Sequence, residues 1–185
     1  MKVAITGNTR GLGAALDTKF SELGYKVKGY SLSQGWDIGD EATRSRLIDD
    51  VADVDIFVNN AYHPLGQLEL LKMFALQYSG KTILNISSKS ALIDINIIKN
   101  QSAQQYIAIK QALNSVASDI MLSGVHNILN VLPGVIDTTM GSIWPGPKLQ
   151  ADFVADKIIS LLAIPEIQQV VIDTPGIDYS VYNQL

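Results

Sequence analysis

The sequence VAITGNTRGLG, at residues 3–13, is the strongest indication of the fold that we expect for this chain. It opens with three apolar residues typical of a short buried strand, and its glycines at 7, 11 and 13 allow a sharp turn. Apolar residues at helical spacing follow: Leu12, Ala15, Leu16, Phe20 and Leu23. Such a turn between strand and helix leaves free N–H groups that can bind a pyrophosphate. A tight turn without a ligand is the alternative interpretation.

Short apolar runs alternate with longer helical patterns along the rest of the chain. The runs predict strands at residues 27–30, 55–58, 82–86, 127–132 and 170–172, with a further candidate at 36–38. The helical patterns cover residues 41–52, 68–78, 104–123 and 150–163. This alternation indicates right-handed crossovers and a parallel sheet. We therefore expect an α/β fold, a Rossmann-like doubly wound parallel sheet with helices on both faces, in a single domain over residues 1–185.

Composition narrows the classes of function. The 185 residues include 14 Lys and Arg against 18 Asp and Glu, and the resulting formal charge of −4 argues against nucleic acid as a partner. The absence of cysteine excludes disulfides, thiol nucleophiles and cysteine-bound metal centres, and two isolated histidines argue against any other metal site. No apolar run is long enough to span a membrane, and the N-terminus turns polar at Thr6, too early for a signal peptide. We expect a cytoplasmic protein.

Three further groups of polar residues are candidates for chemistry. Residues 59–61 (Asn-Asn-Ala) and 87–88 (Ser-Ser) each follow a predicted strand, at the edge where ligands of parallel sheets bind. Tyr106 and Lys110 are four positions apart and share one face of a predicted helix. A nearby ammonium lowers the pKa of a phenol, so this pair can exchange a proton with a substrate oxygen. Taken singly, each group has a structural interpretation, as a loop start, an N-cap serine or a surface pair.

Together these motifs resemble those of the short-chain dehydrogenase/reductase family. They stand in the family's order: TGNTRGLG from Thr6, NNA from Asn59, ISS from Ile86, YIAIK from Tyr106 and PGVIDT from Pro133. The resemblance implies an NADP-dependent oxidoreductase that transfers a hydride to a small carbonyl compound, with the cofactor supplying the hydride.

The resemblance also implies the residues of the site. Tyr106 is the expected acid/base, Lys110 is expected to hold the nicotinamide ribose and lower the tyrosine pKa, and Ser88, rather than Ser87, is expected to polarise the carbonyl. The expected cofactor contacts follow the ends of several strands: Gly7, Asn8, Arg10, Gly11, Leu12, Ser31, Asp37, Ile38, Asn60, Ala61, Pro133, Ile136 and Thr138, together with Tyr106 and Lys110.

Charge at the end of the second strand predicts which cofactor binds. An acidic residue there would bind a free ribose 2′-hydroxyl and repel a 2′-phosphate, and residues 29–33 (Gly-Tyr-Ser-Leu-Ser) contain none. Arg10 matches the basic position of the family's NADP-preferring members. We therefore expect NADP(H) in preference to NAD(H), with a solvated loop charge as the alternative role of Arg10.

The chain also departs from the family's pattern. No helix fits between Tyr30 and Trp36, and no residue matches the family's catalytic asparagine, for which Gln67 is only a distant candidate. Tyr62 replaces the glycine usual after Asn-Asn-Ala, and the apolar residues of the long stretch 89–105 could line a substrate pocket or a subunit interface. These departures suggest an alternative, a non-catalytic dinucleotide-binding or regulatory module, and an epimerase or dehydratase is a third candidate. We expect a homo-oligomer, with a dimer preferred.

Overall fold

The computed structural model describes residues 1–142, 144 and 146–174. Within this part of the chain, six parallel strands form one sheet in the order β2-β1-β3-β4-β5-β6. The strands are β1 (Lys2–Thr6), β2 (Lys26–Tyr30), β3 (Ile56–Asn59), β4 (Thr82–Ile86), β5 (Asn127–Pro133) and β6 (Gln169–Ile172). The chain moves outward from β1 to β2 and then returns past β1 to β3. The strand order therefore reverses between β1 and β3, and such a reversal is where ligands of open α/β sheets bind.

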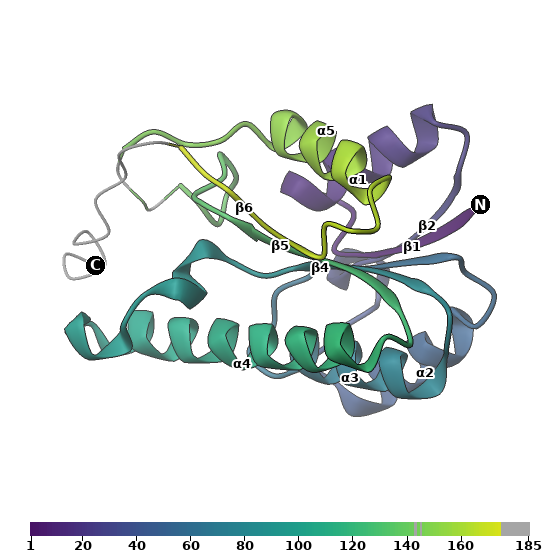
Figure 1. Ribbon diagram of the computed structural model, residues 1–185, viewed down its shortest axis with the longest axis horizontal. Coiled ribbons are helices and arrows are strands. Elements are labelled where there is room, and N and C mark those ends of the chain that lie inside the picture. The colour runs from purple at the N-terminus through teal and green to yellow at the C-terminus, as the bar shows by residue number, and fades with distance from the viewer. Residues whose placement is uncertain (143, 145, 175–185) are drawn as a thin grey trace.

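Helices cover both faces of the sheet (Figure 1). One face carries α1 (Gly11–Glu22) and α5 (Ala151–Leu162), and the other carries α2 (Glu41–Asp50), α3 (Gly66–Gln77) and α4 (Gln101–Ser123). Each layer has its own buried core, with Phe20 in the first and Phe74 in the second. The two cores form because successive strand residues point to opposite faces. The expected doubly wound α/β fold is confirmed.

The prediction of a strand at residues 36–38 is wrong, because these residues form a loop. Trp36 packs edge-on against Tyr30, with 4.9 Å between the ring centroids, and Ile38 is buried in the second core. A strand here would have to pair beyond β2, at the outer edge of the sheet, and would draw these side chains out of that core. The segment runs instead as a loop into α2. The expected lack of a helix before Trp36 is confirmed, since only a single 3₁₀ turn forms there, η1 (Leu32–Gln34).

A row of side-chain amides crosses four neighbouring strands, and the first three amides of the row are buried. Asn59, Asn85, Asn130 and Gln169 are aligned by the register of β3, β4, β5 and β6. Asn59 Nδ2 donates to Asn85 Oδ1 at 2.9 Å, and Asn85 Nδ2 donates to Asn130 Oδ1 at 2.7 Å. Asn130 Nδ2 donates in turn to Gln169 Oε1 at 3.1 Å. Because buried amides are costly unless they are paired, the three buried asparagines fix the relative register of β3, β4 and β5.

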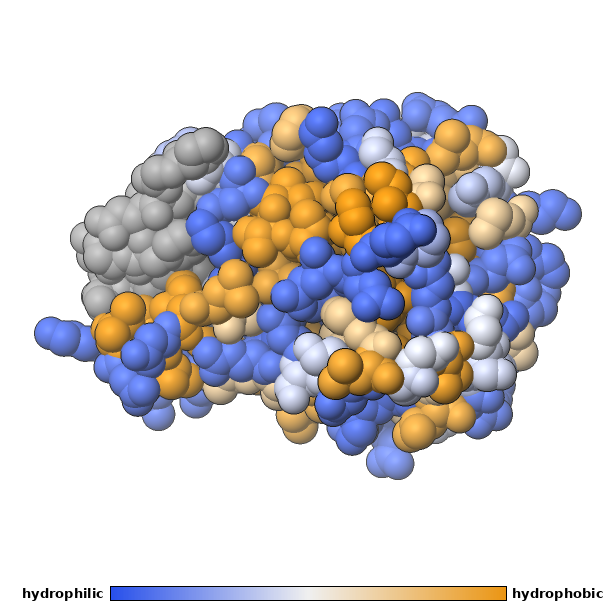
Figure 2. All heavy atoms as spheres, viewed as in Figure 1, coloured by the Kyte–Doolittle hydropathy of each residue, from blue (hydrophilic) through white to orange (hydrophobic). Residues whose placement is uncertain are grey.

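The stretch between β4 and α4 covers the first turns of α4. It contains two 3₁₀ turns, η2 (Lys89–Leu92) and η3 (Ile95–Ile97), and a small apolar cluster forms between this stretch, α4 and Trp144. Leu92 and Ile97 remain more than half exposed. Figure 2 shows hydrophobic atoms on the surface at the left, where Figure 1 places this stretch. Its role as a pocket wall or a subunit interface stays a prediction.

Candidate functional site

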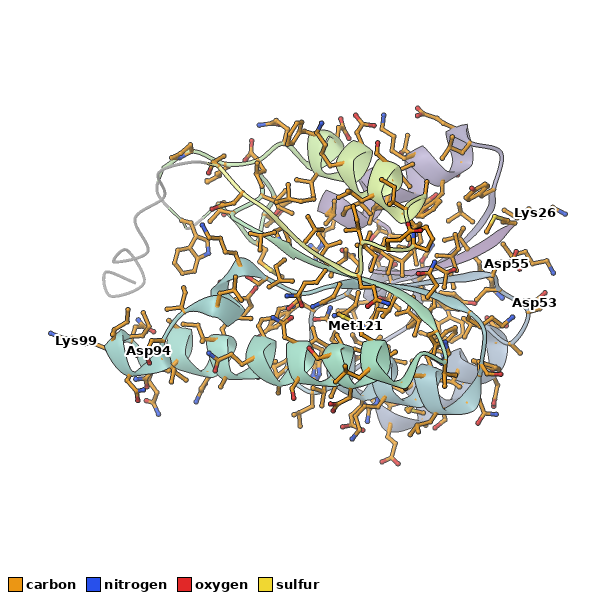
Figure 3. The ribbon with its side chains drawn as sticks, in the orientation of Figure 1. Lys26, Asp53, Asp55, Asp94, Lys99 and Met121 are labelled. Carbon is orange, nitrogen blue, oxygen red and sulfur yellow. The ribbon has the colours of Figure 1, made fainter. Side chains whose placement is uncertain are left out.

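The sequence motifs gather at the carboxyl edge of the sheet. Figure 3 labels the two ends of the molecule: Asp55, directly before β3, lies at one end, and Lys99, shortly before α4, lies at the other. The parallel strands run away from the Asp55 end, so the segments that follow β1, β3, β4 and β5 emerge at the same edge. Parallel pairing therefore brings together side chains that are far apart in the sequence.

The glycine-rich turn after β1 is bonded to the end of β3. The buried Thr6 hydroxyl donates to the carbonyl oxygen of Val58 at 3.2 Å and accepts from the N–H groups of Asn60 and Ala61, at 2.9 and 3.0 Å. The Asn60 side chain donates to the carbonyl oxygen of Thr6 at 2.9 Å. The Asn60 amide thus braces the turn, and a ligand contact from residues 60–61 would use their other atoms.

Two glycines of this turn are required by geometry. Gly7 has φ of 71°, in the left-handed region, and a Cβ added to Gly13 would lie 2.1 Å from the carbonyl oxygen of Gly7. The turn leads directly into α1, whose first N–H groups have no partner within the helix. Anions bind at such helix starts because the N–H groups and the helix dipole both favour negative charge.

Lys110 is buried beneath the same edge. Only 3% of the residue is exposed, and its Nζ donates to Gln67 Oε1 at 2.8 Å and lies 3.5 Å from the carbonyl oxygen of Ile86. Because an ammonium has three N–H donors, one of them has no partner among the described residues. Burial lowers the pKa of Lys110 from 10.5 to about 7. Both the charged and the neutral form are therefore populated near neutral pH.

Two tyrosine rings lie over this lysine. Nζ of Lys110 is 5.2 Å from the ring centroid of Tyr62 and 5.8 Å from that of Tyr106, and the two centroids are 5.4 Å apart. Tyr106 stands one helical turn before Lys110 on α4, so the two share a helix face as their spacing predicts. Burial raises the pKa of Tyr62. The arrangement brings a phenol and an amine together, with a second phenol beside them.

The two serines after β4 have different surroundings. Ser88 Oγ donates to Ser90 Oγ at 2.9 Å and accepts from the Ser90 N–H at 3.1 Å, so it caps the η2 turn. Ser87 Oγ is buried without a partner among the described residues. The η2 turn packs against α4, the helix that carries Tyr106. Because the Ser88 hydroxyl already bonds Ser90, a substrate oxygen would have to displace Ser90 to accept a hydrogen bond from it.

Hydroxyl groups surround the end of β2. Ser31 is buried, and its hydroxyl lies 3.0 Å from that of Ser33, which in turn lies 3.5 Å from the hydroxyl of Thr9. Arg10 follows Thr9 directly and is exposed. The expected cofactor contacts Arg10 and Ser31 thus belong to neighbouring segments.

Four other expected cofactor contacts have side chains that already contact other parts of the protein. Asn8 Nδ2 donates to Asp17 at 2.7 Å, and the side chains of Leu12 and Ile38 belong to the two cores. The exposed carboxylate of Asp37 accepts the N–H two residues further on, at 2.8 Å. A dinucleotide would therefore meet the backbone of residues 8 and 12 rather than their side chains.

The loop after β5 approaches the glycine-rich turn. Pro133 ends β5, and Ile136 forms an isolated bridge with Leu149. A Cβ added to Gly11 would lie 3.0 Å from Cγ2 of Thr138. Of the expected nicotinamide-side residues, Thr138 therefore lies against the start of α1.

The sequence named Gln67 only as a distant candidate for the family's asparagine and Tyr62 only as a departure from the family's pattern, so neither was predicted as a neighbour of Lys110. A signal for Gln67 was present, because it precedes Leu70, Leu71 and Phe74 at helical spacing and is thus a polar residue on an apolar face. We find no comparable signal for Tyr62. No group of acidic or histidine side chains suited to a metal, and no helix long and apolar enough to cross a membrane, occurs among the described residues.

The buried amine predicts how stability depends on pH. With a folded pKa near 7 and an unfolded pKa of 10.5, the folded chain has released a proton between these values that the unfolded chain still holds. The free energy of unfolding should therefore rise with pH from about 7 to 10, by at most about 1.4 kcal/mol per pH unit from this group. Urea unfolding at several pH values should show that Lys110→Met removes this rise, and parallel pH curves for the two proteins would contradict it.

A scan against family models and a search of curated proteins found no match to the chain. Solved structures do match. The 3-alpha-hydroxysteroid dehydrogenase from Pseudomonas sp. B-0831, complexed with NADH, has 18% identity and a TM-score of 0.76, with 94% of this chain and 95% of that chain covered. A short chain dehydrogenase from Burkholderia cenocepacia J2315, in complex with NADP, has 21% identity and a TM-score of 0.75, with 99% and 91% covered.

A third similar structure is the 3-ketoacyl-(acyl-carrier-protein) reductase from Brucella melitensis, complexed with NADH. Its identity is 18% and its TM-score 0.74, with 93% of this chain and 96% of that chain covered. All three structures match this chain over more than nine-tenths of its length. The chain has the fold of the short-chain dehydrogenases/reductases.

Proposed function

We propose that the protein is an NADPH-dependent oxidoreductase that reduces the carbonyl group of a small molecule. The observation that carries the proposal is the buried amine of Lys110 beside the phenol of Tyr106, at the edge where the glycine-rich turn opens α1. The likeness to dehydrogenases solved with NADH or NADP supports a nicotinamide dinucleotide as the cofactor.

The residues present fit such a dinucleotide. The turn at Gly7 and the first N–H groups of α1 suit a pyrophosphate, and the third N–H donor of Lys110 suits a ribose hydroxyl. Because Lys110 is nearly closed off, its ammonium or the ring of Tyr62 has to shift when a ribose binds. The negative charge of a dinucleotide would raise the pKa of Lys110 and so favour its ammonium form.

The side chains can then complete a carbonyl reduction. When bound, the reduced nicotinamide supplies the hydride that the carbonyl carbon accepts. The Tyr106 hydroxyl gives its proton to the carbonyl oxygen, so that an alcohol forms and a phenolate remains. The Lys110 ammonium stabilises this phenolate, and Ser88, released from Ser90, donates a hydrogen bond to the carbonyl oxygen.

A preference for NADPH over NADH follows from the charge around the end of β2. Hydroxyls of Thr9, Ser31 and Ser33 lie near one another there, with Arg10 next in the chain. Hydroxyl and guanidinium groups are good donors to a phosphate, and residues 29–33 contain no carboxylate to repel it.

We expect Tyr106→Phe to lose at least about 100-fold in turnover while NADPH binding is retained, because the variant keeps the ring and loses the transferable proton. Turnover would be followed as NADPH oxidation across a panel of aldehydes and ketones. Tyr25→Phe is the matched control, since Tyr25 stacks on Phe20, away from the site. Unchanged turnover in Tyr106→Phe would remove the proposed role.

We expect Arg10→Ala to weaken NADPH binding by about tenfold or more and to leave NADH binding unchanged, because only NADPH carries the 2′-phosphate. Calorimetric titration with both cofactors measures the two affinities. Arg46→Ala, which removes an equal charge from α2, is the control. The preference is refuted if wild type binds NADH as tightly as NADPH, or if Arg10→Ala binds NADPH normally.

A non-catalytic dinucleotide-binding module is the second candidate. The capping bonds of Ser88 and the coverage of Lys110 favour it, because neither group stands free to meet a substrate. Tight NADPH binding without turnover on a broad carbonyl panel would support this module over the reductase. Cytoplasmic location and a dimeric assembly remain predictions.

A further inference from the structure

The Gln67 side chain is held from two sides. The residue is 1% exposed and lies in the first turn of α3. Its Nε2 donates to the carbonyl oxygen of Asn59, at the end of β3, at 3.0 Å. It also donates to the carbonyl oxygen of Ile86, at the end of β4, at 2.8 Å. The two amide hydrogens are therefore both bonded to the ends of neighbouring strands.

These two bonds decide where the amide oxygen points. Turning the amide over would set its oxygen against two carbonyl oxygens and its N–H groups against the Lys110 ammonium, so only one orientation is acceptable. In that orientation Oε1 faces Lys110 Nζ at 2.8 Å. The backbone carbonyl of Gln67 is bonded as well, since it accepts from Asn59 Nδ2 at 3.0 Å. The oxygen that meets the lysine thus has a fixed position.

Gln67 is also the nearest side-chain acceptor that the lysine has. Among the described groups, the other polar partner of Nζ is the carbonyl oxygen of Ile86 at 3.5 Å, and the remaining neighbours are the rings of Tyr62 and Tyr106. A long, flexible lysine chain needs such an acceptor to stay in one place, because fixing it costs side-chain entropy.

We propose that Gln67 is the positioning residue of the site, whose amide oxygen holds the Lys110 amine where it can reach a ribose and Tyr106. That this placement serves a ribose and Tyr106 rests on the proposed function. The contact between Gln67 and Lys110 does not, because it is present in the protein without a cofactor. Gln67 acts through Lys110 and has no direct part in the proton transfer.

The test is a pH titration of the lysine side chains by NMR, with ¹³C at Cε and no cofactor present. The Lys110 signal is identified by its loss in Lys110→Met. Gln67→Leu removes the acceptor and should lower the Lys110 pKa by about one unit, a tenfold change in the protonation equilibrium. Gln67→Glu places a carboxylate beside Nζ and should raise the pKa by at least about one unit. Gln77→Glu, at the exposed end of α3, should leave it unchanged.

Each outcome decides the proposal. Opposite shifts in Gln67→Leu and Gln67→Glu support it, and a Lys110 titration that stays at the wild-type value in either folded variant overturns it. If neither variant folds, the amide serves the strand ends rather than the lysine, and the proposal is wrong. The predicted shifts without any NADPH binding or turnover would confirm Gln67 and refute the proposed function. Normal turnover without the predicted shifts would support the proposed function and refute the role of Gln67.

Discussion

The contact between the buried amine of Lys110 and the amide oxygen of Gln67 is the interaction on which the site depends. Burial disfavours the ammonium, and the partners that the protein provides for it are neutral oxygens rather than a carboxylate. A carboxylate would bind the lysine as a permanent ion pair and hold it on the protein. A neutral acceptor positions the amine and leaves its charge responsive to a ligand, which suits the role that we propose for Lys110 beside Tyr106.

The sheet supplies the rigidity that this contact needs. Gln67 is bonded to the ends of β3 and β4, and Asn59 links the same place to the row of amides that crosses the sheet. The glycine-rich turn is joined to the end of β3 by Thr6. The glycine-rich turn and the lysine are therefore both anchored to the end of β3, although they are far apart in the sequence. Such shared anchoring limits relative movement of the two halves of the site.

Much of this architecture could be predicted from the sequence, because it follows from local patterns. The strands and helices show as changes of apolar period, and Tyr106 and Lys110 share a helix face by their spacing alone. The same reasoning gave a wrong strand at residues 36–38. Trp36 and Ile38 are apolar because they pack on Tyr30 and in the second core, not because they form a strand. A short apolar run does not reveal which of these applies.

The details of the site were less accessible to sequence. That Ser88 bonds Ser90, that Tyr62 covers Lys110 and that Asn8 turns toward Asp17 all depend on contacts between segments or on the rotamer of one side chain. Gln67 is intermediate: its position on the apolar face of a helix marks it as a buried polar group, but its partner comes from another helix, and only the fold brings the two together.

A crystal structure of the protein grown with NADP⁺ is the most direct test of the proposed roles of Lys110 and Gln67. We expect a pyrophosphate at the glycine-rich turn and the start of α1, and a ribose hydroxyl bonded to Lys110 Nζ while Gln67 Oε1 remains its partner. A dinucleotide that binds elsewhere, or one that leaves Lys110 enclosed by Tyr62 without a ribose contact, would refute these roles.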